Sequence, residues 1–221
     1  MAKLGTLNTI IDDIMLILRQ NNISESEQLS RIQIESWIHQ YRSMLIKQDI
    51  DKNRDINPDY IQEITAIPLD IVDHYGSSEF EGGDKILVTS IDIPKSIDFH
   101  FKSGIVSVSD LFGNEIQLMG EKRSNMQKYR KYTFYNYSAF RKGDKIYING
   151  PGDIQAVNIR GIFENPTTIA NYDIENDIYP IPVNMIPTLK ELIFAKEFKI
   201  NLVTDKENNS TDDTQNLTLK R

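Results

Sequence analysis

The sequence contains no cysteine, which excludes disulfide bonds, thiolate metal sites and a cysteine nucleophile. Histidine is also scarce, and His39, His74 and His100 are too far apart to show the ligand spacing of a zinc site. The glycine-rich patterns that cradle phosphates are missing, and no serine stands in a nucleophile motif. We therefore expect no catalytic, cofactor-binding or metal-binding residues, and a protein that is not an enzyme.

Long apolar runs are missing as well, so the sequence suggests no membrane span. Asp12 and Asp13 interrupt the apolar N-terminal stretch, which therefore does not have the pattern of a signal peptide. The 221 residues are 39% hydrophobic and 26% charged, as in an ordinary globular protein with a substantial core. We expect synthesis in the cytoplasm and no association with a membrane.

One acidic run resembles a calcium loop. In residues 49–60, acid and amide side chains fall at loop positions 1, 3, 5 and 7. Arg54, however, stands where the turn requires glycine, and Tyr60 stands where a bidentate glutamate is needed. A solvated turn at the end of a helix is the better interpretation.

Apolar residues with helical spacing predict helices at both ends of the chain. A first helix is expected over about residues 6–20 and a long second one over about 25–50, with a capping box at Ser24 and Glu27. The short connection between them favours an antiparallel hairpin. Helical spacing returns after a proline cluster and covers more than one face, which indicates burial on two sides.

The middle of the chain has the alternation of strands, with turns at Gly113–Asn114, at residues 142–144 and at residues 149–153. Short strands joined in this way favour a small sandwich or barrel. The predicted domains are an N-terminal helix hairpin, an inserted β-domain, a C-terminal helix and a flexible tail, at residues 1–59, 60–182, 183–203 and 204–221.

Charge is distributed unevenly along the sequence. Residues 121–145 carry eight Lys or Arg against two acids, with six aromatic residues among them, so this run is near +6 in a chain of net charge −7. Three interpretations remain open. The run could hold single-stranded nucleic acid, its aromatics could belong to the core of a strand, or it could meet an acidic face on a neighbouring subunit.

The helix hairpin, the two-sided C-terminal helix, the segregated charge and the loose tail together favour a subunit of a ring or connector. Head-to-tail cyclic assembly needs two different, complementary surfaces on every copy. The positive run and the acidic remainder of the chain are a candidate pair.

Three stretches of the sequence resemble a known family: ISESEQLSRIQIESWIHQYRSMLIKQ, AVNIRGIFENP and IYPIPVNMIPTLKELIFAKEF, at residues 23–48, 156–166 and 178–198. In this order they resemble the head-to-tail connector or ring proteins of short-tailed phages. The closest likeness is to a ring protein of the crAss-like phages, and a more distant one is to the tail-tube adaptor family.

This resemblance implies an α+β fold, in which a helical bundle carries an inserted antiparallel β-sandwich or barrel-like domain. It implies a virion protein made in the host cytoplasm, with twelve copies in a ring at the head-tail junction. The ring would dock below the portal, continue the DNA channel without binding DNA specifically, and provide a platform for the next ring or tail protein. A nucleic-acid-binding module built on residues 121–145 remains the alternative.

Aromatic residues dominate interface energetics, so the candidate anchors of the helices are Trp37, Tyr41, Phe194 and Phe198. For Trp37 and Tyr41, a place in the subunit's own core is an equally good interpretation. We expect the helices to make the lateral and portal-facing contacts.

Two further candidate contacts come from the charged run and the tail. Arg130 and Lys131 are the basic residues expected to meet the acids of a neighbour. Leu217 and Leu219 are the apolar residues of a polar tail that would become ordered only against the portal or an adjacent subunit.

Overall fold

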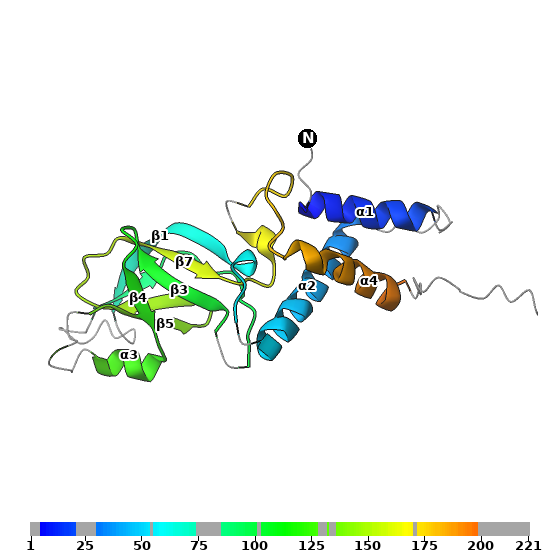
Figure 1. The fold of residues 1–221 in the computed structure, drawn as a ribbon. Coiled ribbons are helices and arrows are strands. Elements are labelled where there is room, and N and C mark those ends of the chain that lie inside the picture. The colour runs from blue at the N-terminus through cyan, green and yellow to red at the C-terminus, as the bar shows by residue number, and fades with distance from the viewer. Residues whose placement is uncertain are drawn as a thin grey trace, which may run out of the picture.

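The structure is a computed structural model that describes residues 5–20, 30–53, 55–73, 85–100, 103–127, 132, 136–169 and 172–198. Within these ranges, four α-helices accompany a closed barrel of seven strands. The barrel lies beside a group of three helices, α1, α2 and α4, while α3 lies at the edge of the barrel away from that group (Figure 1).

The elements alternate along the chain, so that residues far apart in sequence meet at the boundary between helices and barrel. The helices are α1 Leu7–Gln20, α2 Arg31–Asn53, α3 Glu121–Gln127 and α4 Ile186–Lys196, with 3-10 turns η1 Pro58–Tyr60, η2 Pro166–Thr168 and η3 Val183–Met185. The strands are β1 Gln62–Asp73, β2 Lys85–Thr89, β3 Ile105–Asp110, β4 Glu115–Leu118, β5 Ser138–Lys142, β6 Lys145–Asn149 and β7 Ala156–Gly161.

The barrel closes because the long strand β1 has two partners. Its first half pairs with β7 and its second half pairs with β2, which gives the strand order β1-β2-β6-β5-β4-β3-β7. The pairing register shifts between Ile64 and Ile67, where Ala66 adopts a positive φ of 54°. The Ala66 backbone N–H donates to Asn158 Oδ1 at 2.8 Å, which compensates for the interrupted ladder.

Helix α3 gives the barrel its one parallel pair among the described strands. The chain leaves β4, passes through α3 and returns to pair β5 parallel to β4. A parallel pair needs a crossover connection, and the segment that contains α3 provides it. The barrel interior is filled by aliphatic residues from every strand, including Val108, Ile146 and Ile159.

Helix α2 is the central helix of its group because a row of residues spaced by four faces inward. Ile34, Ile38, Arg42, Ile46 and Ile50 are all buried. The first part of this row packs against α1, α4 and the segment that leads into α4. Its last part, at Ile46 and Ile50, packs against Tyr60, Phe99 and Ile162 beside the barrel, so that a single helix contributes to two hydrophobic clusters.

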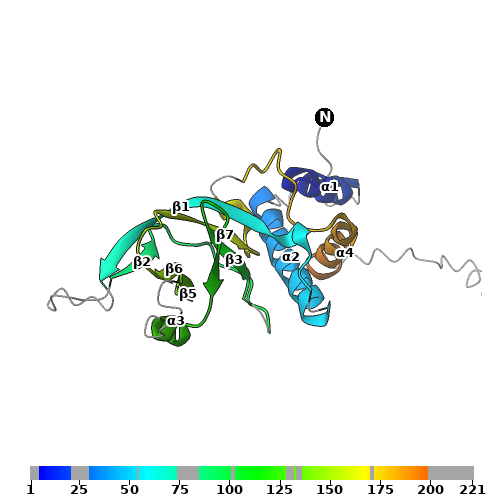
Figure 2. The same cartoon turned by 60° about the vertical axis from the view of Figure 1, so that its left-hand side comes forward.

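The predicted fold class, an α+β helical bundle with an inserted antiparallel β-sandwich or barrel-like domain, is wrong. The described residues form four helices and a closed seven-stranded barrel. Two separate sheets do not arise, because β1 joins β2 and β7 and so closes one continuous sheet. The helices do not form a bundle either, since α1 lies across α2 in both views (Figures 1 and 2).

Of the three predicted turns, the one at Gly113–Asn114 is longer in the structure. Gly143 and Asp144 make a two-residue hairpin within the predicted turn at residues 142–144, with positive φ at Gly143. The β3–β4 loop instead spans residues 111–114, with positive φ at Gly113. After the turn at residues 149–153 the chain continues into β7, which pairs with β1 and β3.

Candidate functional site

The face shared by α2 and α4 brings four of the predicted contact residues together. The rings of Trp37 and Phe198 meet edge to face with centroids 5.3 Å apart, and Phe194 lies 5.9 Å from Phe198. The Tyr41 hydroxyl donates to Glu197 Oε1 at 2.6 Å, and this hydrogen bond raises the pKa of Tyr41 to about 12. Phe194 is fully buried, whereas Trp37, Tyr41 and Phe198 keep part of their surface exposed.

A buried arginine connects this group of helices to the barrel. Arg42 is fully buried; its Nε donates to the Pro180 carbonyl and its Nη1 donates to the Phe163 carbonyl, both at 2.8 Å. The guanidinium also lies over the Tyr179 ring, 5.5 Å from the centroid. Its hydrogen-bond acceptors in the described residues are carbonyls rather than carboxylates, and burial lowers the pKa of Arg42.

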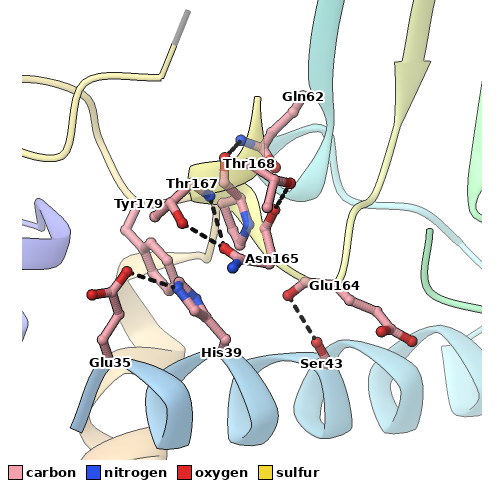
Figure 3. A network of polar contacts seen from close by, with 10 residues as sticks. Glu35, His39, Ser43, Gln62, Glu164, Asn165, Thr167, Thr168 and Tyr179 are labelled. Atoms are coloured by element: carbon pink, nitrogen blue, oxygen red, sulfur yellow. Dashed lines mark hydrogen bonds and ion pairs between the residues drawn. The ribbon is translucent and has the colours of Figure 1, made fainter. Parts of the chain in front are cut away.

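The next turn of α2 adds a second polar contact to the same junction. His39 Nδ1 lies 2.8 Å from the Tyr179 hydroxyl, and His39 Nε2 lies 3.4 Å from Glu35 Oε1. Figure 3 shows Glu35 and His39 rising from α2 toward Tyr179, while Ser43 reaches the Glu164 carbonyl further along the helix. Burial lowers the pKa of His39, and the hydrogen bond with Glu35 opposes that effect.

These contacts hold the helices and the barrel in one arrangement. Arg42 and Ser43 both bind backbone carbonyls just after β7, at Phe163 and Glu164. Arg42 also binds the carbonyl of Pro180, just before α4. A single helix therefore fixes both ends of the segment that leads from the barrel to α4.

The β3–β4 loop presents an aromatic side chain to solvent. Phe112 is 92% exposed and Leu111 is 54% exposed. The loop is braced by Asp110, whose carboxylate accepts from the backbone N–H groups of Phe112 and Asn114 at 2.9 and 2.8 Å. The hydrogen bond from the Asn114 side chain is the main reason why the pKa of Asp110 is lowered. A fixed loop with an exposed phenyl ring has the character of an interface anchor.

The first part of the basic run is a helix, which the strand interpretation missed. Helix α3 is attached to the barrel through Ser124, whose Oγ lies 2.8 Å from Ser138 Oγ and accepts from Asn149 Nδ2 at 2.8 Å. Lys122 and Met126, one turn apart, are exposed. Further along the run, Arg130 and Lys131 lie outside the described residues, as do Leu217 and Leu219 of the tail.

In the calcium-like run of residues 49–60, two carboxylates accept hydrogen bonds from other residues of the chain. Asp49 Oδ2 accepts from the Tyr60 hydroxyl at 2.7 Å, and Asp51 Oδ1 accepts from the His100 backbone N–H at 3.1 Å. Among the residues that the structure describes, no three His, Asp or Glu side chains are grouped to hold a metal ion. None of the helices in the described ranges has both the length and the apolar content needed to cross a bilayer.

Sequence reasoning singled out Trp37 and Tyr41 on α2 and missed the polar contacts of Arg42 and His39. The signal was present, because Arg42 falls in the series of residues spaced by four that begins at Ile34. A cation within such a series indicates either a buried partner or a contact with backbone carbonyls.

Comparison with known proteins adds one match. A family model described as phage tail ring protein 2 matches residues 9–214, which is nearly the whole chain. A search of the curated proteins returns no match. The resemblance to a ring protein of the crAss-like phages is confirmed. This chain belongs to the phage tail ring protein 2 family of those phages.

Proposed function

We propose that this protein forms a head-to-tail connector ring below the portal of the phage, continues the DNA channel, and provides the platform for tail assembly. The observation that carries the proposal is the family match over residues 9–214. A phage tail ring protein is a component of the virion and associates with copies of itself. The family also suggests a structural rather than an enzymatic role.

The arrangement of the chain supports a connector. The helices and the barrel are joined by the buried contacts of Arg42, so each copy can behave as one rigid block with a helical end and a barrel end. A block of this kind can contact the portal at one end and the next ring or tail protein at the other. In our proposal, residues 1–59 and 183–203 provide the helical end and residues 60–182 the barrel end.

The helical end is the proposed portal-facing and lateral surface. Trp37, Tyr41 and Phe198 would make contacts there through their exposed parts, while the buried Phe194 lies against Phe198. Aromatic residues of this kind supply large contact areas with few rotatable bonds. The tail with Leu217 and Leu219 would add a second contact to the portal, and its ordering cost would be recovered on binding.

DNA should pass through the ring without being held. Duplex DNA carries one negative charge per about 1.7 Å of its axis, so a strongly basic channel would bind it tightly. We therefore assign Arg130 and Lys131 to a neighbouring subunit's acids and not to the channel. The ring would hold twelve copies, assembled from protein made in the host cytoplasm, and would need no cofactor.

Mass spectrometry of purified particles tests this proposal. We expect the protein in stoichiometric ratio to the portal protein, and retained after washing in salt that removes loosely attached host proteins. An abundant host cytoplasmic protein, followed through the same washes, is the control. Particles that contain no copies of this chain would contradict the proposed function.

A further inference from the structure

A pocket with an acidic rim lies where the barrel meets the helices. Its volume is about 650 Å³, and it is formed by η1, the start of β1 and the segment that leads into α4. Three acids line it, Asp59, Glu63 and Asp177, and no Lys or Arg is among its lining residues. All three acids are exposed. The pocket is therefore a negatively charged hollow.

The same pocket has an apolar component that the chain leaves uncovered in the described structure. Ile178 is 61% exposed and Val183 is 73% exposed, and both line the pocket. The turn before Ile178 is fixed internally, since Asp177 Oδ2 accepts from the Asp173 backbone N–H at 2.8 Å. Asp173 also accepts from the Asn176 side chain at 2.7 Å. The turn is therefore held in place before a partner binds. The acids of the pocket fit basic groups of a partner, and Ile178 and Val183 fit an apolar one.

Helix α3 presents a surface with that chemistry. Met126 is 62% exposed, and Lys122 and Arg123 beside it are exposed with no ion-pair partner in the described part of the chain. The acid of this helix, Glu121, is paired with Lys142 at 3.2 Å. The net outward charge of α3 is therefore positive, and its one large exposed apolar side chain lies among the positive groups.

The two surfaces lie on different sides of the molecule. Helix α3 is at the edge of the barrel away from the other helices, whereas η1 and the segment before α4 lie beside those helices (Figures 1 and 2). One copy cannot bring its own α3 to its own pocket without unfolding the barrel between them. Two complementary surfaces on separate sides of one chain are what a heterologous, head-to-tail ring requires.

We propose that α3 of one copy docks over the acidic pocket of the next copy, with Met126 seated against Ile178 and Val183. Lys122 and Arg123 would then face Asp59, Glu63 and Asp177. The contact repeats around the ring, so every copy uses both of its surfaces. This inference rests on the proposed ring, and it specifies which residues join neighbouring subunits.

Charge exchange tests the contact directly. The variant K122E/R123E should reverse the α3 surface, and D59K/E63K should reverse the pocket rim. Each should raise the concentration for half-maximal ring assembly at least tenfold, because like charges would face each other across the contact. The control K85E/K95E changes the charge equally on exposed residues outside both surfaces and outside the helical end, and should assemble as the wild type does. Assembly is measured by sedimentation of the full-length chain.

Mixing the two variants gives the sharpest outcome. In an equimolar mixture, each reversed surface meets a reversed partner and each native surface meets a native one, so rings of alternating copies should form. Neither a folding defect nor a general charge effect predicts this recovery. Recovery on mixing supports the contact; normal assembly of either variant alone, or no recovery on mixing, overturns it.

Cross-linking provides a second readout that does not depend on charge. The chain has no cysteine, so M126C/I178C introduces the only two thiols. A short bismaleimide should join copies into a ladder of multimers, whereas F112C/I178C should give none. A wild-type chain that stays monomeric at high concentration, with no ladder from M126C/I178C, overturns the inference. The virion role would still stand if mass spectrometry finds the protein in particles.

Discussion

Replacing the buried Arg42 with lysine tests whether the helices and the barrel are held together as described. The Arg42 guanidinium donates to two carbonyls, of Phe163 and Pro180, that lie far apart in sequence. The ammonium of lysine is compact and can reach one of them well, so the other carbonyl remains buried without its donor. A hydrogen bond that involves a charged group contributes about 1.5–3 kcal/mol. The position over Tyr179 can be kept by either cation.

We therefore expect R42K to lower the free energy of unfolding by about 2–3 kcal/mol, measured by urea denaturation. The matched control is R31K on the same helix. Arg31 pairs with Asp12 at 3.0 Å, but both side chains are more than half exposed. Exposed pairs contribute about 0.2–1 kcal/mol, so R31K should stay within about 0.5 kcal/mol of the wild type. Equal stability of R42K and R31K would refute the structural role given to Arg42.

Three further predictions concern pH, the tail and the basic run. Because burial lowers the pKa of His39, the unfolded chain binds more protons below its ordinary pKa of 6.5, and stability should fall as pH drops through that value. The slope due to His39 is at most about 1.4 kcal/mol per pH unit, and H39Q should flatten it in urea titrations; an unchanged slope would exclude His39 as the cause. Deleting residues 204–221 should leave the thermal midpoint unchanged and weaken portal binding in pull-down assays, whereas full binding would rule out a role for the tail. The variant R130E/K131E should block ring assembly, and the wild type should retain negligible DNA in gel shifts near physiological salt; retention that the variant abolishes would instead favour the nucleic-acid interpretation.

The sequence predicted the elements better than their arrangement. Alternation and turn chemistry located β5, β6 and the hairpin at Gly143, because these signals are local. The pairing of β1 with β7, which closes the barrel, shifts register at Ala66, a residue type that does not signal a positive φ. Pairing between distant strands, such as β1 with β7, leaves no short-range pattern in the sequence.

In the candidate site, too, local features could be predicted from the sequence and contacts between distant segments could not. Trp37, Phe194 and Phe198 were predicted as contact residues of the helices, and the structure brings the rings of Trp37 and Phe194 to that of Phe198. The pocket could not be predicted, because its acids come from η1, β1 and a turn more than a hundred residues further along the chain. The helix α3 was missed because Met126 is the one apolar residue among its seven, so the segment carries no apolar periodicity.

A reconstruction of the particle's tail vertex, at a resolution that separates helices from strands, tests the central claim most directly. We expect a closed ring of twelve copies between the portal and the next tail component, with the barrel of each copy touching its neighbour through α3. A vertex whose rings are built from other chains, with this one absent, would contradict the account.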